Sequence, residues 1–257
     1  MKAQDGPSRR RVLRLLPAVP VAAVSLPAKA VPPAPLRMTT MQVEPFGVIE
    51  KSGRLSGIYV DLSTMLARES GVVIDDSVVP YPRAMAMMAS GDADLIMSIT
   101  NSKLAAVARP LALLYTSDVV LMGRGGASFA SLADAHGRTV AYIRGAEHSL
   151  EFNADGAIAK HEIINFRQGV KMLLEGRVDG VIGLRQSLLY VLRELGLPRK
   201  ALGRALVLGQ REAWLYMSRK APSQEAAPLL ARTANAMRER GAVKAVMDGY
   251  FGSLWPE

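Results

Sequence analysis

The sequence carries one short unit twice, and this repeat constrains the fold more than any other feature. Residues 88–99 read MASGDADLIMSI and residues 173–184 read LLEGRVDGVIGL. Both copies have apolar residues at helical spacing, then a glycine, then an aspartate three positions on, then a short apolar run. The two copies are offset by 85 residues and contain Gly91 with Asp94 and Gly176 with Asp179.

Each copy is interpreted as the end of a helix followed by a buried strand. Glycine ends a helix at little cost because it accepts a positive φ. The apolar runs show little alternation, which is typical of parallel strands buried on both faces. The copies are therefore predicted to close two βαβ units, one in each of two lobes. Asp94 and Asp179 enter their strands at the amino-terminal edge, whereas ligands bind beyond the carboxyl ends, so both are predicted to be structural hydrogen-bond acceptors.

Helix and strand patterns alternate along the rest of the chain, which predicts an α/β fold with largely parallel pairing. Asp61 is expected to cap a helix that Gly71 ends, and Pro82 to lie in the first turn of the helix that Gly91 ends. Strands are expected at 38–43, 72–74, 95–99, 138–143, 162–165 and 178–183, with a hairpin turn at 51–54. Later helices are expected at 168–175, 187–195, 224–240 and 242–250, and strands that cross between the lobes at 118–122 and 214–218, with a glycine hinge at 123–126.

The first thirty residues resemble an export signal. A basic segment at 8–14 precedes an apolar run at 15–27 and the small residues around Ala30, where cleavage is predicted. The apolar run of 13 residues is too short to span a bilayer of roughly 30 Å as a helix. Paired arginines after Ser8 favour the twin-arginine route, and an ordinary Sec signal is the alternative. The mature protein is therefore expected to be soluble and periplasmic.

Charge and composition exclude several classes. The net charge of +9 falls to +4 without residues 1–30, and the remaining basic residues are scattered, so no nucleic-acid partner is expected. The chain has no cysteine, which excludes disulfides, thiol nucleophiles and cysteine metal sites. The three histidines lack ligand spacing, so no metal or cofactor is expected. We find no GxSxG, HExxH, P-loop or Rossmann glycine motif, so the chain is not expected to be an enzyme.

Taken together, several stretches resemble the extracellular solute-binding proteins of family 3. They follow the family's order and cover nearly all of the chain after the signal. They are Pro45-Phe46, GIYVDLSTMLARESGV (57–72), YPRAMAMMASGDADLIMSIT (81–100), SLADAHGRTVAYIRG (131–145), LLEGRVDGVI (173–182), YMSRKAP (216–222) and KAVMDGYFG (244–252).

The resemblance implies a type 2 periplasmic-binding fold with two lobes, each a mixed, mostly parallel sheet flanked by helices, joined by two crossing segments. Lobe one would comprise 37–122 plus 213–257, and lobe two 123–212. A monomeric chain would capture a small polar organic solute between the lobes and deliver it to the permease of an ABC-type transporter. The open alternatives are a periplasmic lyase or dehydratase-like enzyme on the same fold, and a ligand-sensing partner of a membrane receptor.

The resemblance also implies ligand-binding residues. Two aromatic residues would flank the solute, and the Ser-x-Thr end of a strand would offer hydroxyl and backbone groups. The turn at Gly145 would present amides at a helix start, and nearby charged groups would complete the site. The implied residues are Phe46, Tyr81, Arg83, Ser98, Thr100, Gly145, Glu147 and Arg185.

The sequence departs from the family's amino-acid clamp. The arginine for the α-carboxylate would fall near Ala105, the aspartate for the α-amino group near Leu184, and the usual threonine after Gly145 is Ala146. A simple α-amino acid is therefore not the expected ligand. Arg83, Arg144, Arg185 and Glu147 are hypothesised to form a different polar set for an acidic or larger solute, and Glu147 beside His148 is the one pair that an enzyme could use for acid–base chemistry.

Overall fold

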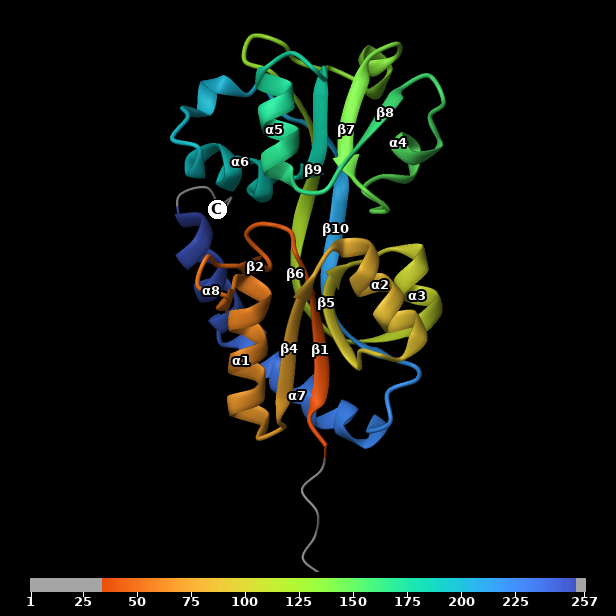
Figure 1. The fold of residues 1–257 in the computed structure, drawn as a ribbon, viewed down its shortest axis with the longest axis vertical. Coiled ribbons are helices and arrows are strands. Elements are labelled where there is room, and N and C mark those ends of the chain that lie inside the picture. Colours follow the sequence, from red (N-terminus) through yellow and green to blue (C-terminus); the bar gives the residue numbers. More distant parts are fainter. Residues whose placement is uncertain (1–33, 253–257) are drawn as a thin grey trace, which may run out of the picture. The chain divides into compact units, whose positions relative to one another are not determined.

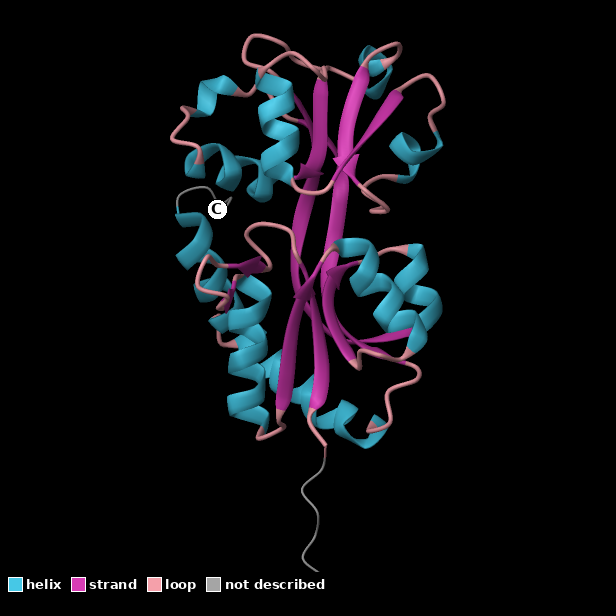
Figure 2. Ribbon diagram, viewed as in Figure 1, coloured by secondary structure: helices cyan, strands magenta, loops and turns pink. Residues whose placement is uncertain are grey.

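The computed structural model describes residues 34–252, so the predicted export signal at 1–30 lies outside the described residues. One eight-stranded sheet runs through them in the order β4-β1-β5-β10-β6-β9-β7-β8 (Figures 1 and 2). The strands are β1 (Leu36–Met41), β4 (Ile74–Val79), β5 (Leu95–Ile99), β6 (Ala108–Gly123), β7 (Thr139–Ile143), β8 (Ala159–Ile163), β9 (Gly180–Leu184) and β10 (Leu206–Ser218). A separate hairpin pairs β2 (Val48–Ile49) with β3 (Leu55–Ser56), and residues 51–54 form its turn as predicted.

The sheet has two parallel halves joined by two long antiparallel strands. In the first half β1 pairs in parallel with β4 and β5, and in the second β7 pairs in parallel with β8 and β9. The joining strands β6 and β10 pair with each other. On their outer sides β10 pairs with β5 and β6 pairs with β9. These are the two predicted crossing strands, and at 16 and 13 residues they are much longer than the predicted runs. The alternating α/β fold is confirmed, and the exact lobe boundaries stay a prediction.

Helices cover the sheet (Figure 2). They are α1 (Ile58–Ser70), α2 (Tyr81–Ser90), α3 (Ser102–Val107), α4 (Leu150–Ala154), α5 (Phe166–Leu174), α6 (Arg185–Glu194), α7 (Ala227–Glu239) and α8 (Ala242–Phe251), with short 3-10 turns η1 (Leu132–Ala135), η2 (Arg199–Ala201) and η3 (Gln224–Ala226). Within residues 34–252 we find no helix long and apolar enough to cross a membrane.

The predicted helix ends are largely confirmed. Gly71 and Gly91 both take the left-handed conformation directly after α1 and α2, and Pro82 lies in the first turn of α2. The predicted cap at Asp61 is wrong, because α1 begins at Ile58 and follows Gly57 without a side-chain cap. The Asp61 carboxylate instead accepts a hydrogen bond from the Tyr250 hydroxyl of α8 at 2.8 Å.

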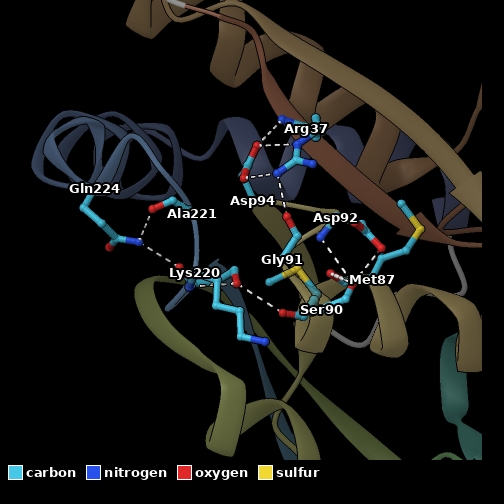
Figure 3. A network of polar contacts seen from close by, with 11 residues as sticks. Arg37, Met87, Ser90, Gly91, Asp92, Asp94, Lys220, Ala221 and Gln224 are labelled. Atoms are coloured by element: carbon cyan, nitrogen blue, oxygen red, sulfur yellow. Dashed lines mark hydrogen bonds and ion pairs between the residues drawn. The ribbon is translucent and has the colours of Figure 1, made fainter.

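The repeated aspartates tie neighbouring parallel strands together. Asp94, whose side chain is 2% exposed, accepts hydrogen bonds from the Arg37 backbone amide at 2.9 Å and from its guanidinium at 2.8 and 3.0 Å (Figure 3). Asp179 accepts one bond from the Thr139 amide at 2.8 Å. Each carboxylate therefore joins the start of its own strand to the start of the adjacent one, and the prediction that both are structural hydrogen-bond acceptors is confirmed.

Candidate ligand-binding site

A cavity lies where the carboxyl ends of the parallel strands meet. Met41 and Ile99 end β1 and β5 in the first half of the sheet, and Ile143 and Leu184 end β7 and β9 in the second. The two halves thus point their carboxyl ends at one place, which is where open α/β sheets bind ligands. The full lining is Met41, Val43, Phe46, Tyr59, Tyr81, Ile99, Ile143, Ala146, His148, Phe166 and Leu184.

Stacked aromatic rings form one wall of the cavity. The Phe46 ring stacks on Tyr59 with 4.8 Å between centroids, and the Tyr59 and Tyr115 hydroxyl oxygens are 2.6 Å apart in a buried hydrogen bond. Gly57 makes this packing possible, since its φ of 115° and its close approach to the Phe46 carbonyl leave no room for a Cβ. Burial raises the pKa of Tyr59 well above its usual value, so the hydroxyl stays neutral.

Two more aromatic residues come from helix starts. Tyr81 opens α2 just after β4, and burial, with a smaller effect of the Glu147 charge, raises its pKa to about 12. Phe166 opens α5 after Asn165, whose side chain caps the helix by accepting the Gln168 amide. Phe166 lies against Gly183 of β9 so closely that a Cβ at Gly183 would overlap the ring. The backbone of β9 therefore fixes where the Phe166 ring meets the cavity.

His148 is the polar residue that stands out in the lining. It is 4% exposed, and both ring nitrogens are buried without a hydrogen-bond partner among the described residues. Its backbone carbonyl accepts a bond from the Arg211 guanidinium at 3.1 Å, and its ring lies 6.2 Å from the Phe166 ring. Burial, reinforced by the Arg211 charge, lowers the pKa of His148 to about 4, so the ring is neutral near pH 7.

This buried histidine predicts a pH dependence of stability. Because its folded pKa of about 4 lies below the ordinary value near 6.5, the unfolded chain binds the proton more tightly. His148 should therefore cost about 2 kcal/mol of stability as the pH falls from 7 to 5. Asp76, whose pKa burial raises to about 6, acts in the opposite direction over part of this range. The measurement is therefore the free energy of unfolding in urea of the wild type and of His148→Phe between pH 7 and pH 5. If the two free energies changed with pH in parallel, the prediction would be contradicted.

The structure places the uncharged residues predicted for the site in two groups. Phe46 and Tyr81 line the cavity, and Gly145 precedes the lining residue Ala146 with a φ of 75°. Ser98 is fully buried, and its hydroxyl donates a hydrogen bond to the Ile99 carbonyl at 3.2 Å. The Thr100 backbone amide donates a hydrogen bond to the Glu212 carbonyl at 2.9 Å. Their contact with a ligand stays a prediction.

The predicted charged residues do not gather around the cavity. Arg185 pairs with Asp118 at 2.9 Å, Arg144 pairs with Glu162 at 2.9 Å, and Arg83 is exposed on α2. Glu147 accepts hydrogen bonds from the Ser102 amide at 2.9 Å and the Ser102 hydroxyl at 2.6 Å. The hypothesised polar set is thus divided among separate partners in this structure. Glu147 and His148 likewise face different partners, since the ring lines the cavity and the carboxylate bonds α3.

Several lining residues were not predicted as site residues. Tyr59, Phe166 and His148 lie in helical or turn segments whose inward faces only the folded structure defines. Leu184 and Ala146 were noticed as apolar residues where the family has polar ones, and both line the cavity. Leu184 is the last residue of β9 and Ala146 lies three residues after β7, and these positions at the carboxyl ends of strands are the signal that could have assigned them.

Three similar proteins are described as binding proteins or as a ligand-binding core. A probable amino-acid-binding protein of Bacillus subtilis (strain 168), YxeM, is 24% identical over 177 residues, which is 66% of this chain and 67% of the relative. The arginine-, lysine-, histidine-binding protein ArtJ of Geobacillus stearothermophilus superposes with a TM-score of 0.69 at 16% identity, covering 85% of this chain and 95% of ArtJ. The GluR0 ligand-binding core of Nostoc punctiforme, solved with L-glutamate, superposes with a TM-score of 0.71 at 18% identity, covering 84% and 99%.

These solved structures establish the type 2 periplasmic-binding fold, and the family is identified by sequence. The family model for bacterial extracellular solute-binding proteins, family 3, matches residues 36–253, which include all eight strands of the main sheet and the whole lining of the cavity. The chain therefore belongs to the bacterial extracellular solute-binding proteins of family 3.

Proposed function

We propose that this protein captures a small organic solute in the aromatic-lined cavity and delivers it to a membrane transporter of the ABC type. The observation that carries the proposal is the convergence of both sets of parallel strands on one cavity. The protein would act outside the cytoplasm as a monomer. The relatives' names point the same way, because YxeM and ArtJ are both described as binding proteins for amino acids.

Contacts between the two halves of the sheet support capture by closure. Glu147 follows β7 and bonds Ser102 at the start of α3, and Arg167 of α5 pairs with Glu44 beyond β1 at 2.7 Å. Both contacts join a segment of one half to a segment of the other. In a hinged protein such contacts form as the halves close over the solute, and they then slow its release.

Removing the Glu147 contact is expected to weaken solute binding. Glu147→Ala deletes two hydrogen bonds between half-buried and exposed groups, so we expect about fivefold weaker binding, mainly through faster dissociation. Glu162→Ala is the matched control, because Glu162 pairs with Arg144 inside one half. Stopped-flow dissociation of the solute measures the effect, and equal rates in the two variants would argue against closure through this contact.

A thermal-shift screen tests solute capture. The compounds would be free amino acids, small organic acids, amines and neutral ring compounds, and we expect one chemical class to raise Tm in a saturable manner. Uptake of the best compound by cells with and without the gene then tests delivery. If no compound shifts Tm, capture is contradicted; if binding occurs but uptake does not depend on the gene, delivery to a transporter is contradicted.

A further inference from the structure

The cavity lining is uncharged. None of its eleven residues is Asp, Glu, Lys or Arg, and four of them are the aromatic residues Phe46, Tyr59, Tyr81 and Phe166. An ionised group moved from water into such a lining loses its hydration without gaining a counter-ion. A zwitterionic amino acid would bring two such groups. The lining therefore disfavours a free amino acid and favours an uncharged solute.

Two positions at which the family's polar residues would bind an amino acid carry apolar residues in this chain. Ala146 and Leu184 occupy the lining at the carboxyl ends of β7 and β9, and the nearby Arg185 is paired with Asp118. The side chain of Ser98 is bonded to the Ile99 carbonyl. The Arg185 and Ser98 side chains thus already have protein partners.

The imidazole of His148 differs from these two side chains. Both of its nitrogens are buried without a partner among the described residues, and buried polar atoms normally have one. The ring lines the cavity, so a solute in the cavity can supply the missing bond. In a neutral imidazole one nitrogen is a donor and the other an acceptor, and the tautomer decides which; the nitrogen that faces the solute can therefore bond either a donor or an acceptor.

We propose that the cavity binds a compact, uncharged ring compound carrying one neutral hydrogen-bonding group, such as a carboxamide or hydroxyl, which bonds to His148. This inference rests on the proposed function and narrows its ligand class. The aromatic residues and Leu184 cover the ring, and His148 orients the polar group. A quaternary ammonium ion also suits aromatic surroundings, but it has no hydrogen-bonding group to satisfy His148 and meets no carboxylate in the lining.

The test is calorimetric titration of the wild-type protein with four small probes that differ in charge. Benzamide, benzoate, phenylalanine and tetramethylammonium present a neutral, an anionic, a zwitterionic and a quaternary cationic group. We expect benzamide to bind at least about tenfold more tightly than the other three. Tighter or equal binding of any charged probe overturns the ligand class, and so does the absence of benzamide binding.

A variant tests the role of His148. His148→Phe keeps a flat ring but removes both nitrogens, so benzamide should bind about tenfold more weakly while toluene, which needs no hydrogen bond, binds within about twofold of wild type. Equal weakening of both probes, or of neither, overturns the assignment of His148. The wild-type panel decides the ligand class even if this variant fails to fold. A charged compound found in the broad thermal-shift screen would overturn this inference and leave solute capture standing.

Discussion

Asp94→Ala is expected to lower the free energy of unfolding by about 3 kcal/mol, because it removes three hydrogen bonds from a fully buried carboxylate. One of those bonds is to the backbone amide of Arg37, which the variant leaves without its partner. Asp179→Ala is the matched control from the second copy of the repeat. Among the described residues its exposed carboxylate accepts a single hydrogen bond, from the Thr139 amide, so a loss of about 1 kcal/mol or less is expected.

Urea unfolding of the two variants at pH 7 measures this difference. Burial acts to raise the pKa of Asp94, but the hydrogen bonds and charge of Arg37 outweigh it and hold the pKa below its ordinary value. The stabilisation is therefore present above the ordinary pKa of aspartate and is lost as the pH falls through the lower folded value. Equal losses for Asp94→Ala and Asp179→Ala would refute the distinction drawn from burial.

Gly183→Ala is expected to reduce solute binding by about tenfold or more, because the new Cβ overlaps the Phe166 ring and forces it to move at the edge of the cavity. The glycine has ordinary strand geometry, so the effect comes from the contact with Phe166 and not from backbone strain. Overpacking should also cost about 1–3 kcal/mol of stability.

Gly180→Ala separates the two effects. Gly180 lies in the same strand, and its Cβ would press on Leu121 and Phe129, neither of which lines the cavity. We expect a comparable loss of stability with solute affinity unchanged. Titration of both variants with the best compound of the thermal-shift screen checks this, and similar affinities for Gly183→Ala and Gly180→Ala would place the solute elsewhere.

The fold was predictable because its evidence is local. Helix-ending glycines such as Gly91, mostly apolar strands such as β5, and the repeated aspartates each report on a few neighbouring residues, and each was confirmed. The errors were also local: Asp61 has the chemistry of a cap, but the helix starts three residues earlier, where Gly57 allows the close approach of Phe46. The lengths of β6 and β10 depend on pairing between distant strands, which periodicity does not encode.

The site residues were less predictable than the fold, because the folded structure decides which groups a charged side chain pairs with. Arg185 and Glu147 lie near the carboxyl ends of strands, as a binding residue should, yet they bond Asp118 and Ser102. Phe46 and Tyr81 were easier, since a large aromatic ring at a strand or helix junction is readily buried against the adjoining cavity. The sequence marks His148 only as the neighbour of Glu147, and the lack of a hydrogen-bond partner for its ring among residues 34–252 is visible only in the folded protein.

Native mass spectrometry of the protein purified from its own host tests the central claim most directly. The account predicts that each wild-type chain retains one small molecule, which is uncharged in the cavity and can be identified after release. Gly183→Ala should retain much less of this molecule, and Gly180→Ala should retain nearly as much as the wild type. The claim would be contradicted if the chain carried no solute and accepted none from the compound library, or if Gly183→Ala retained the same molecule in the same amount.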